Sequence, residues 1–556
     1  MAGFHIEHFG CRAARADGEA VGGWLRAAGL DERSEAVSDV VVVNTCSVTA
    51  EADRAARAFI RRTHRLNPDA RIVVTGCYAQ RAPEELAALA GVAAVVGNSH
   101  KAMAPEIILG LAGAGTWAGS RAETVAVEGP IPSGELEKHS PKAKGAEERL
   151  EPGMVSVPSL MAGGIPIWAD DRFAHSFIDE GQLEPGTQTR PNLKIQEGCG
   201  NRCTFCVIPQ TRGSSRSLPV ARVLKQVEGF VAAGGNELVL SGINLGRWGW
   251  DLAGLAGESE LDLLAPSRSG KDNVPKNGRG GVPAVPPFPQ KEAERTGHGA
   301  TLLDARSFWN GARRSVAGLR LAGLARWILE ESGLPRLRLS SIEPMDWDGE
   351  LIGLMAEFGG LRLARHAHLP LQSGSDAVLR RMHRRYRPWH YVDKVEALVR
   401  AAGRELTLGA DVMVGFPGET DGEFEETMEM VRALPFGYLH LFPFSPRPGT
   451  RCWALHAETP VATAAVEERM TALRGLAAEK SRAHREQFVG REVEAITLHT
   501  PAAMAARGRT AALTENFLAV EMAGQLEANR LVRVRVTGLN AEGALAGEFA
   551  AADSMV

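Results

Sequence analysis

Short runs of β-branched apolar residues alternate with longer, polar, helix-like segments in the first third of the chain. The clearest run is Val40-Val41-Val42-Val43, and similar runs occupy residues 4–9 and 71–76. Apolar runs without polar alternation are typical of strands that are buried on both faces, as in parallel sheets covered by helices. The pattern predicts an open parallel α/β sheet domain over residues 1–115.

A second strand–loop–helix rhythm runs through residues 191–480. The expected strands are residues 192–196, 237–240, 336–339, 367–371, 406–414 and 438–444. Nearly all of them end in loops rich in Gly, Ser and Pro. Six parallel strands with helices between them fit a partial (βα)6 barrel, in which function sits at the loops that follow the strands.

The chain ends in short alternating strands over residues 486–550, which predict a small antiparallel barrel of five strands. Two other stretches, residues 116–190 and about 254–316, are rich in Gly, Pro, Ser, Glu and Lys and show weak periodicity. We expect the first to be a low-complexity linker and the second a surface insertion within the barrel domain, both partly disordered.

Composition narrows the class of protein only modestly. The 556 residues carry a formal net charge of −4, which argues neither for nor against a nucleic-acid partner. The sequence contains no apolar run of about eighteen residues and no basic, apolar leader. Seven cysteines in so long a chain indicate reduced thiols or metal ligands. We expect a cytoplasmic protein without a membrane segment.

Three cysteines follow the first expected barrel strand at CxxxCxxC spacing. They are Cys199, Cys203 and Cys206. Three thiolates this close can hold three irons of a 4Fe–4S cluster and leave the fourth iron open for a substrate or cofactor. The alternatives are a zinc site or buried free thiols, but zinc usually takes four protein ligands, and no further Cys or His follows closely.

Three more cysteines each follow an apolar run of the N-terminal domain. They are Cys11, Cys46 and Cys77. In open α/β sheets, ligand sites lie at the carboxyl ends of strands, so these thiols are expected to converge there as a second ligand set. Taken singly, each of them could equally be a small buried apolar residue.

Two segments are strongly basic. The expected helix at residues 50–65 carries five arginines, and residues 380–387 contain Arg380, Arg381, Arg384 and Arg385 beside Tyr386. Arginines can contact phosphates, and an aromatic ring can stack on an unpaired base. We predict RNA contacts for both segments, with solvated helix faces as the alternative.

These motifs together resemble those of the methylthiotransferase family within the radical S-adenosylmethionine enzymes. CxxxCxxC is the signature of the wider class, and Cys11, Cys46 and Cys77 match the narrower family. Residues 336–344, 368–376 and 439–450 most resemble the bacterial branch that acts on N6-threonylcarbamoyladenosine at position 37 of tRNA. Ile342-Glu343-Pro344 stands where the isopentenyladenosine branch typically has Ser-His-Pro. One departure is Ala14, where the family usually has Asn.

The resemblance implies two 4Fe–4S clusters and S-adenosylmethionine as cofactors. Cys199, Cys203 and Cys206 would hold the cluster that binds S-adenosylmethionine and yields a 5′-deoxyadenosyl radical. Cys11, Cys46 and Cys77 would hold an auxiliary cluster that supplies the sulfur delivered to C2 of adenine. Phe205, Ser340, Gly415 and Gly418 are candidates to line the cofactor site, and the C-terminal barrel resembles the RNA-binding TRAM domain.

The implied partners are tRNA, a flavodoxin- or ferredoxin-type electron donor and a sulfur source, and we expect a monomer. No residue is expected to act as a general acid or base, although Glu343 or Asp411 could make a polar contact to cofactor or substrate. The alternatives are methylthiolation of isopentenyladenosine-37 or of a ribosomal-protein aspartate, or a non-catalytic iron–sulfur protein that binds RNA.

Overall fold

The apolar runs of the N-terminal third form a parallel sheet. The computed structural model describes residues 2–10, 12–113, 165–171, 173, 183, 190–252 and 319–550. The expected linker and insertion therefore lie largely outside the described residues, and Cys11 lies outside them as well. The sheet has the order β2-β1-β3-β4-β5-β6. Its strands are β1 (Gly3–His8), β2 (Asp31–Glu32), β3 (Val40–Thr45), β4 (Arg71–Gly76), β5 (Val92–Gly97) and β6 (Ile167–Trp168).

Helices cover both faces of this sheet, which explains why β3 is apolar throughout. Val40 and Val42 belong to one buried cluster, and Val41 and Val43 belong to another. The helices are α1 (Arg12–Ala27), α2 (Ala50–Leu66), α3 (Cys77–Arg81), α4 (Pro83–Ala87) and α5 (Ala104–Leu111). Helix α2 begins at Thr49, whose hydroxyl accepts a hydrogen bond from the Ala52 amide at 3.2 Å.

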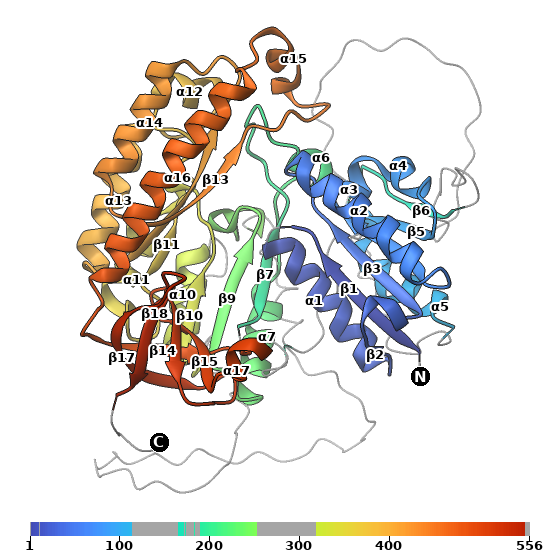
Figure 1. The fold of residues 1–556 in the computed structure, drawn as a ribbon, viewed down its shortest axis with the longest axis horizontal. Coiled ribbons are helices and arrows are strands. Elements are labelled where there is room, and N and C mark those ends of the chain that lie inside the picture. The colour runs from blue at the N-terminus through green and yellow to red at the C-terminus, as the bar shows by residue number, and fades with distance from the viewer. Residues whose placement is uncertain are drawn as a thin grey trace, which may run out of the picture.

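The middle of the chain forms the expected open barrel of six parallel strands, beside the N-terminal domain (Figure 1). Its strands are β7 (Asn192–Glu197), β9 (Glu237–Gly242), β10 (Arg336–Leu339), β11 (His366–His368), β12 (Thr407–Val414) and β13 (Phe436–Pro443). They form two sheets, β10-β9-β7-β8 and β11-β12-β13, where β8 is the short antiparallel strand Arg216–Ser217. The Ile342 amide donates to the His368 carbonyl at 3.0 Å and connects the two sheets.

Long helices pack on the outside of the barrel strands. They are α7 (Val220–Ala232), α10 (Leu321–Glu331), α11 (Gly349–Phe358), α13 (Pro388–Ala402), α14 (Asp421–Ala433) and α16 (Thr463–Glu486). Three shorter helices lie in the loops after the strands: α6 (Ile208–Arg212), α12 (Asp376–Arg381) and α15 (Arg451–Glu458). The fold class predicted from the sequence is thus confirmed.

The inner face of the barrel is unusually polar. Leu or Ile occupies alternate positions of β7, β9 and β10 and enters the buried cluster under the helices. The positions between them face the other way and are mostly polar: Lys194, Gln196, Glu237, Val239, Ser241, Arg336 and Arg338. Barrels of this kind are commonly filled by branched apolar side chains. A polar inner face therefore indicates a chamber that accepts polar ligands.

A closed five-stranded barrel at the C-terminus seals the amino end of the larger one, as the red strands in Figure 1 show. Its strands are β14 (Glu492–Thr497), β15 (Arg509–Thr514), β16 (Ala519–Ala523), β17 (Leu531–Leu539) and β18 (Leu545–Phe549). Arg338 of β10 donates to the Thr514 carbonyl at 3.3 Å and to Glu237 at 2.8 Å. Burial would raise the pKa of Glu237, but Arg338, Arg190 and Arg336 outweigh it and lower the pKa to about 2.

None of the helices in the described part of the chain is long and apolar enough to cross a membrane.

Helix α16 contains a histidine whose burial makes stability depend on pH. His484 is 6% exposed, and its Nε2 lies 2.8 Å from the Thr407 hydroxyl. Burial, followed by the neighbouring Arg485, lowers the pKa of His484 from 6.5 to about 4. Between these values the unfolded chain binds the proton and the folded chain does not, so stability falls as the pH is lowered through this range.

We predict that His484→Gln flattens the decrease in thermal stability between about pH 6.5 and pH 4. The measurement is the melting temperature of the variant and the parent chain across this range, with His390→Gln on the outer helix α13 as the control. Parallel pH profiles for the parent chain and His484→Gln would contradict the assignment.

Candidate functional site

The CxxxCxxC cysteines lie in the loop between β7 and α6, at the carboxyl end of the barrel. N–H groups point at two of their sulfur atoms. Cys199 Sγ accepts from the Asn201 amide at 3.4 Å and from Asn244 Nδ2 at 3.6 Å. Cys203 Sγ accepts from Arg384 Nη1 at 3.3 Å. Such donors stabilise negative charge on sulfur, which is the form in which cysteine binds metal.

The backbone of this loop is fixed by its neighbours. Gly198 has a φ of +71°, and a Cβ added there would lie 2.0 Å from the Ser214 carbonyl oxygen. The Gln196 side-chain amide donates to the carbonyls of Glu197 and Gly198, both at 2.9 Å. Its oxygen accepts from the Asn244 amide at 2.6 Å. The loop that carries the cysteines is therefore held in place before any metal binds.

Arg384 is part of this site and does not form an exposed RNA contact. It is 8% exposed, and its Nη2 donates to both carboxylate oxygens of Glu343 at 2.7 Å. Its guanidinium lies 5.0 Å from the centre of the Tyr386 ring. A cavity of about 240 Å³ opens here, lined by Gly200, Asn201, Arg202, Cys203, Glu343, His383, Arg384 and Arg385.

The prediction that Tyr386 stacks on an RNA base is wrong. The ring is fully buried, and its hydroxyl lies 2.8 Å from the Pro370 carbonyl and 2.7 Å from the Leu371 carbonyl. Arg381 is tied to Glu423 by two hydrogen bonds of 2.8 Å. Arg380, His383 and Arg385 are the exposed residues of this segment, and both of these arginines are paired with a carboxylate. The basic run thus mainly fixes the loops around the cysteines.

The four residues expected to line the cofactor site lie around the same end of the barrel. Phe205 is partly buried and packs against the barrel core. Ser340 follows β10 and is 4% exposed, and its hydroxyl has no hydrogen-bond partner among the described residues. Gly415 and Gly418 follow β12 with φ values of +77° and +71°. Their contact with a cofactor stays a prediction.

The second cysteine set lies at the carboxyl ends of adjacent parallel strands. Cys46 follows β3 and Cys77 follows β4, and both are buried. Gly10, the residue before Cys11, lies against Cys46, because a Cβ added there would be 3.6 Å from Cys46 Sγ. Gly10 thus lies close to Cys46, whereas Cys11 itself lies outside the described residues.

The sulfur of Cys77 also receives donors. Asn98 Nδ2 donates to it at 3.4 Å, and Arg212 Nε donates to it at 3.2 Å. Arg212 is the last residue of α6, the helix that follows the CxxxCxxC loop. One short helix thus connects the two cysteine sets.

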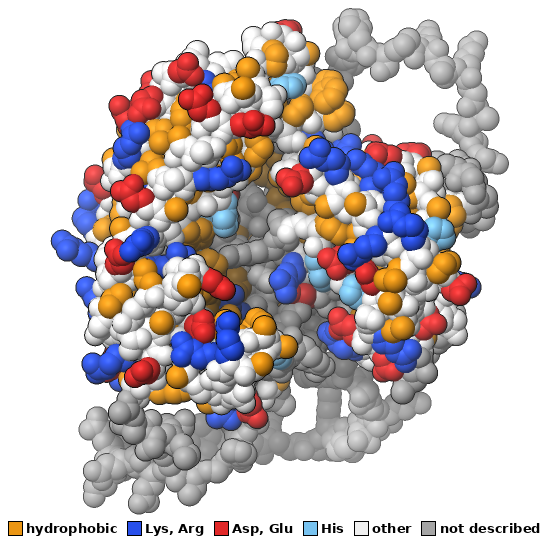
Figure 2. Space-filling model, viewed as in Figure 1, with side chains coloured by type: hydrophobic (Ala, Val, Ile, Leu, Met, Phe, Trp, Pro, Cys, Tyr) orange, Lys and Arg blue, Asp and Glu red, His pale blue; other side chains and the backbone are white. Residues whose placement is uncertain are grey.

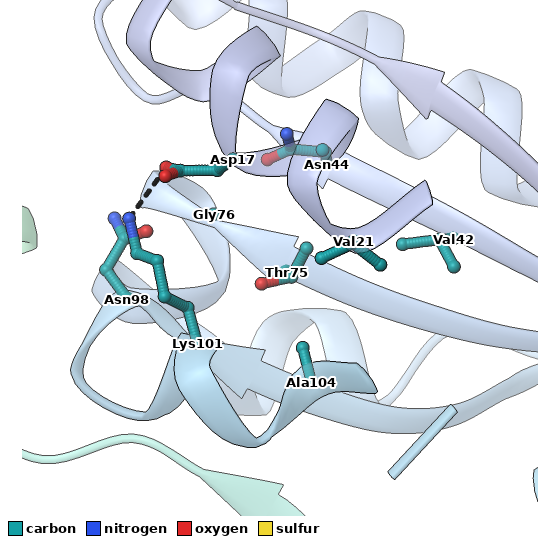
Figure 3. Close-up of a pocket in the computed structure, with 10 residues that line it drawn as sticks. Asp17, Val21, Val42, Asn44, Thr75, Gly76, Asn98, Lys101 and Ala104 are labelled. Atoms are coloured by element: carbon teal, nitrogen blue, oxygen red, sulfur yellow. Dashed lines mark hydrogen bonds and ion pairs between the residues drawn. The ribbon is translucent and has the colours of Figure 1, made fainter. Parts of the chain in front are cut away.

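Arg212 belongs to a buried network of ion pairs between the N-terminal domain and the barrel. Its Nη1 lies 2.6 Å from Glu197 and 3.2 Å from Asp17. Lys101 lies 2.7 Å from Asp17, as Figure 3 shows, and 3.1 Å from Glu197. Lys194 pairs with the same two carboxylates. Although burial would raise the pKa values of both carboxyl groups, these cations lower them below their usual range.

Three basic side chains thus share two carboxylates in the buried interior, and one of them, Arg212, also donates to the Cys77 sulfur. This arrangement holds a fixed hydrogen-bond donor at that sulfur. The network was missed by sequence reasoning. One sign of this network was present in the sequence: Lys194 is a charged residue within a strand, and both of its neighbours in the sequence are apolar.

The donor sets fit iron–sulfur ligation. Soft thiolates are the usual ligands of 4Fe–4S clusters, and hydrogen bonds to their sulfurs tune such sites. Burial raises the pKa of Cys206 to about 12. Metal binding must therefore displace a proton from that thiol.

Comparisons with known proteins agree with this chemistry. Residues 3–97 match the Uncharacterized protein family UPF0004, and residues 316–431 match the Radical SAM superfamily. The chain is 29% identical to the threonylcarbamoyladenosine tRNA methylthiotransferase MtaB of Aquifex aeolicus, over 96% of this chain and 99% of the relative. It is 30% identical to the protein of the same name from Bacillus subtilis, over 96% and 94%.

A relative that has a different activity in its name is equally similar to this chain. The tRNA-2-methylthio-N(6)-dimethylallyladenosine synthase of Cereibacter sphaeroides is 30% identical, over 98% of this chain and 97% of the relative. An open parallel barrel with CxxxCxxC after its first strand defines the class of radical S-adenosylmethionine enzymes. Within that class, the chain belongs to the methylthiotransferase family. The cofactors of this family are 4Fe–4S clusters and S-adenosylmethionine, as expected from the sequence.

We predict that Arg212→Met lowers the free energy of unfolding by about 1.5–3 kcal/mol, because Asp17 and Glu197 lose the buried guanidinium donor and keep only the two lysines. Arg380→Met is the matched control. It removes an exposed pair with Asp376 four residues away on α12 and should cost about 0.3–0.5 kcal/mol. The measurement is chemical denaturation of both variants, and equal losses would contradict the assigned weight of the network.

Proposed function

We propose that this chain inserts a methylthio group at C2 of N6-threonylcarbamoyladenosine at position 37 of tRNA. The observation that carries the proposal is the pair of cysteine sets on one scaffold, connected through Arg212. Cys199, Cys203 and Cys206 hold one cluster, and Cys11, Cys46 and Cys77 hold the other. When bound, these clusters supply reductive cleavage of S-adenosylmethionine and a sulfur atom for transfer.

Other side chains of the site donate to the cysteine sulfurs, line the cofactor site and bind the substrate. Arg384, Asn201 and Asn244 donate to the sulfurs of the first set, and Glu343 orients Arg384. Arg212 and Asn98 do the same for Cys77. Phe205, Ser340, Gly415 and Gly418 line the S-adenosylmethionine site. The polar inner face of the barrel takes the substrate base.

The choice of substrate rests on two supports. MtaB proteins from two organisms are similar to this chain along nearly its full length. In addition, Glu343 lies in the Ile-Glu-Pro segment that distinguishes the two tRNA branches, and it holds Arg384 against Cys203. Isopentenyladenosine-37 is the second candidate, because a dimethylallyladenosine synthase is equally similar.

tRNA is the macromolecular partner in this proposal, and α2 provides part of its docking surface. Arg54, Arg61 and Arg65 are exposed on this helix and form no ion pair with any described residue. Figure 2 shows Lys and Arg side chains in a row over the N-terminal domain, where Figure 1 places α2. An electron donor of flavodoxin or ferredoxin type and a sulfur source complete the reaction, and the enzyme acts as a monomer in the cytoplasm.

We predict that Cys46→Ala retains formation of 5′-deoxyadenosine and abolishes the methylthio-nucleoside, whereas Cys203→Ala abolishes both. The measurement is anaerobic turnover of the reconstituted protein with S-adenosylmethionine, reductant and tRNA, followed by nucleoside mass spectrometry. Cys452→Ser is the control, because this buried thiol belongs to neither set and donates only to the Thr204 hydroxyl, at 3.1 Å. Loss of 5′-deoxyadenosine in Cys46→Ala would contradict the division between the sets.

We also predict that Arg61→Ala and Arg65→Ala weaken tRNA binding and each reduce the slope of log K against log salt by about 1. Arg326→Ala is the control, because that exposed arginine is paired with Glu330 and Glu357 on the outside of the barrel. The measurement is fluorescence anisotropy of a labelled anticodon stem–loop over a salt series. An unchanged slope would remove α2 from the RNA surface.

A further inference from the structure

Three polar side chains meet inside the barrel at a place that none of the steps above uses. They are His368 on β11, Asp411 on β12 and His440 on β13. Asp411 is the register partner of His440, and His368 is paired with Gly409, two residues before Asp411. The Asp411 Oδ1 atom lies 3.4 Å from His368 Nε2 and 3.2 Å from His440 Nδ1. Three neighbouring strands thus present one continuous polar surface.

This surface is open on one side and closed on the other. The His368 side chain is 7% exposed, Asp411 is 26% exposed and His440 is 58% exposed. His368 Nε2 is buried, and its 3.4 Å contact with Asp411 Oδ1 is a weak hydrogen bond. A buried polar atom without a full partner is costly, and it is typical of a site that a ligand completes.

Aromatic rings pack against these side chains, because the rings of His368 and His440 both contact Tyr438. The Tyr438 hydroxyl lies 2.7 Å from His366 Nε2, and the rings of Tyr438 and His366 contact Phe517 of the C-terminal barrel. Gly409 makes room for the Tyr438 ring, because a Cβ at this position would lie 2.1 Å from the ring. The polar surface thus rests on aromatic rings from both barrels.

The position of Asp411 along β12 limits which ligand groups can contact it. Gly415, which follows β12, is four residues further along the chain, and this corresponds to about 13 Å in an extended strand. Groups held at the carboxyl-end loops are therefore too far away to contact Asp411 directly. A base that enters among those loops could reach it only through a substituent that extends into the barrel.

We propose that His368, Asp411 and His440 bind the substituent on N6 of the target adenine, and that this substituent is a polar chain with hydrogen-bond donors. The inference rests on the proposed function, which it deepens. The Asp411 carboxylate accepts hydrogen bonds from the N–H and O–H groups of a threonylcarbamoyl chain, and the imidazole nitrogens that do not face Asp411 accept further hydrogen bonds from these groups. Although burial opposes ionisation, hydrogen bonds from both histidines hold the pKa of Asp411 well below its usual range.

The same surface disfavours an isopentenyl group. That substituent consists of carbon and hydrogen, so it would cover Asp411 and His368 without satisfying them. A site built to hydrogen-bond a substrate rejects an analogue that lacks the matching groups far more strongly than an apolar pocket rejects a polar isostere. Discrimination between the two tRNA substrates therefore originates in these three side chains.

A divalent cation is the competing occupant. Ligand atoms of His368, Asp411 and His440 all lie within 4.8 Å of one another. Two imidazoles and a carboxylate at this spacing can also bind a divalent metal ion. Metal analysis of a chain in which all seven cysteines are changed to Ala or Ser separates the two cases. About one equivalent of metal that is lost in His440→Gln would overturn the proposal.

The test compares Asp411→Asn and His440→Gln with the parent chain on two anticodon stem–loops of equal sequence. One carries threonylcarbamoyl at N6 of A37, and the other carries isopentenyl. We expect both variants to lose affinity for the first by about ten- to hundredfold and to bind the second unchanged or more tightly. Formation of 5′-deoxyadenosine from S-adenosylmethionine without RNA should be unchanged, and His390→Gln on the outer face should behave as the parent chain.

Failure of the inference and failure of the proposed function are distinguishable. If the parent chain methylthiolates the threonylcarbamoyl substrate and the variants bind both stem–loops as the parent does, the inference is wrong and the function stands. If the parent chain modifies only the isopentenyl substrate, the proposed function is wrong and the inference falls with it.

Discussion

The buried network of Asp17, Glu197, Lys101, Lys194 and Arg212 is the interaction on which the site depends. Asp17 and Lys101 come from the N-terminal domain, whereas Lys194, Glu197 and Arg212 come from the barrel. Removing charges from water is costly, and that cost is offset only when every charge finds close partners. The two domains can therefore satisfy these groups in only one relative placement. This placement brings Cys77 against Arg212 and so fixes the two cysteine sets relative to each other.

The network has a second effect. Arg212 donates both to the Cys77 sulfur and to the carboxylates of the network. The network that positions the domains thus also fixes a hydrogen-bond donor at the auxiliary site. By contrast, the CxxxCxxC loop obtains its donors from neutral amides and from one arginine, Arg384, which is already paired with Glu343.

Local pattern was sufficient to predict the elements of the fold, because strands and helices follow from periodicity. Val40–Val43 predicted a doubly covered strand, and the six barrel strands were placed within a few residues of their observed positions. The site was predicted less completely. Spacing indicated the cysteines, but the RNA contacts predicted for Tyr386 and Arg384 were wrong, because composition does not show that these two side chains are buried. Neither the ion-pair network nor the His368–Asp411–His440 surface was predicted, since both unite residues far apart in the sequence.

The position of Phe517 changes the role of the terminal barrel. By sequence that domain looks like an appendage, yet this ring lies 4.4 Å from the His366 ring and 5.5 Å from the Tyr438 ring, inside the larger barrel. Radical chemistry depends on the exclusion of water and of unwanted hydrogen donors. The terminal domain thus also covers part of the inner face of the barrel. Its loss would uncover the rings of His366 and Tyr438 and bring solvent to the amino end of the barrel.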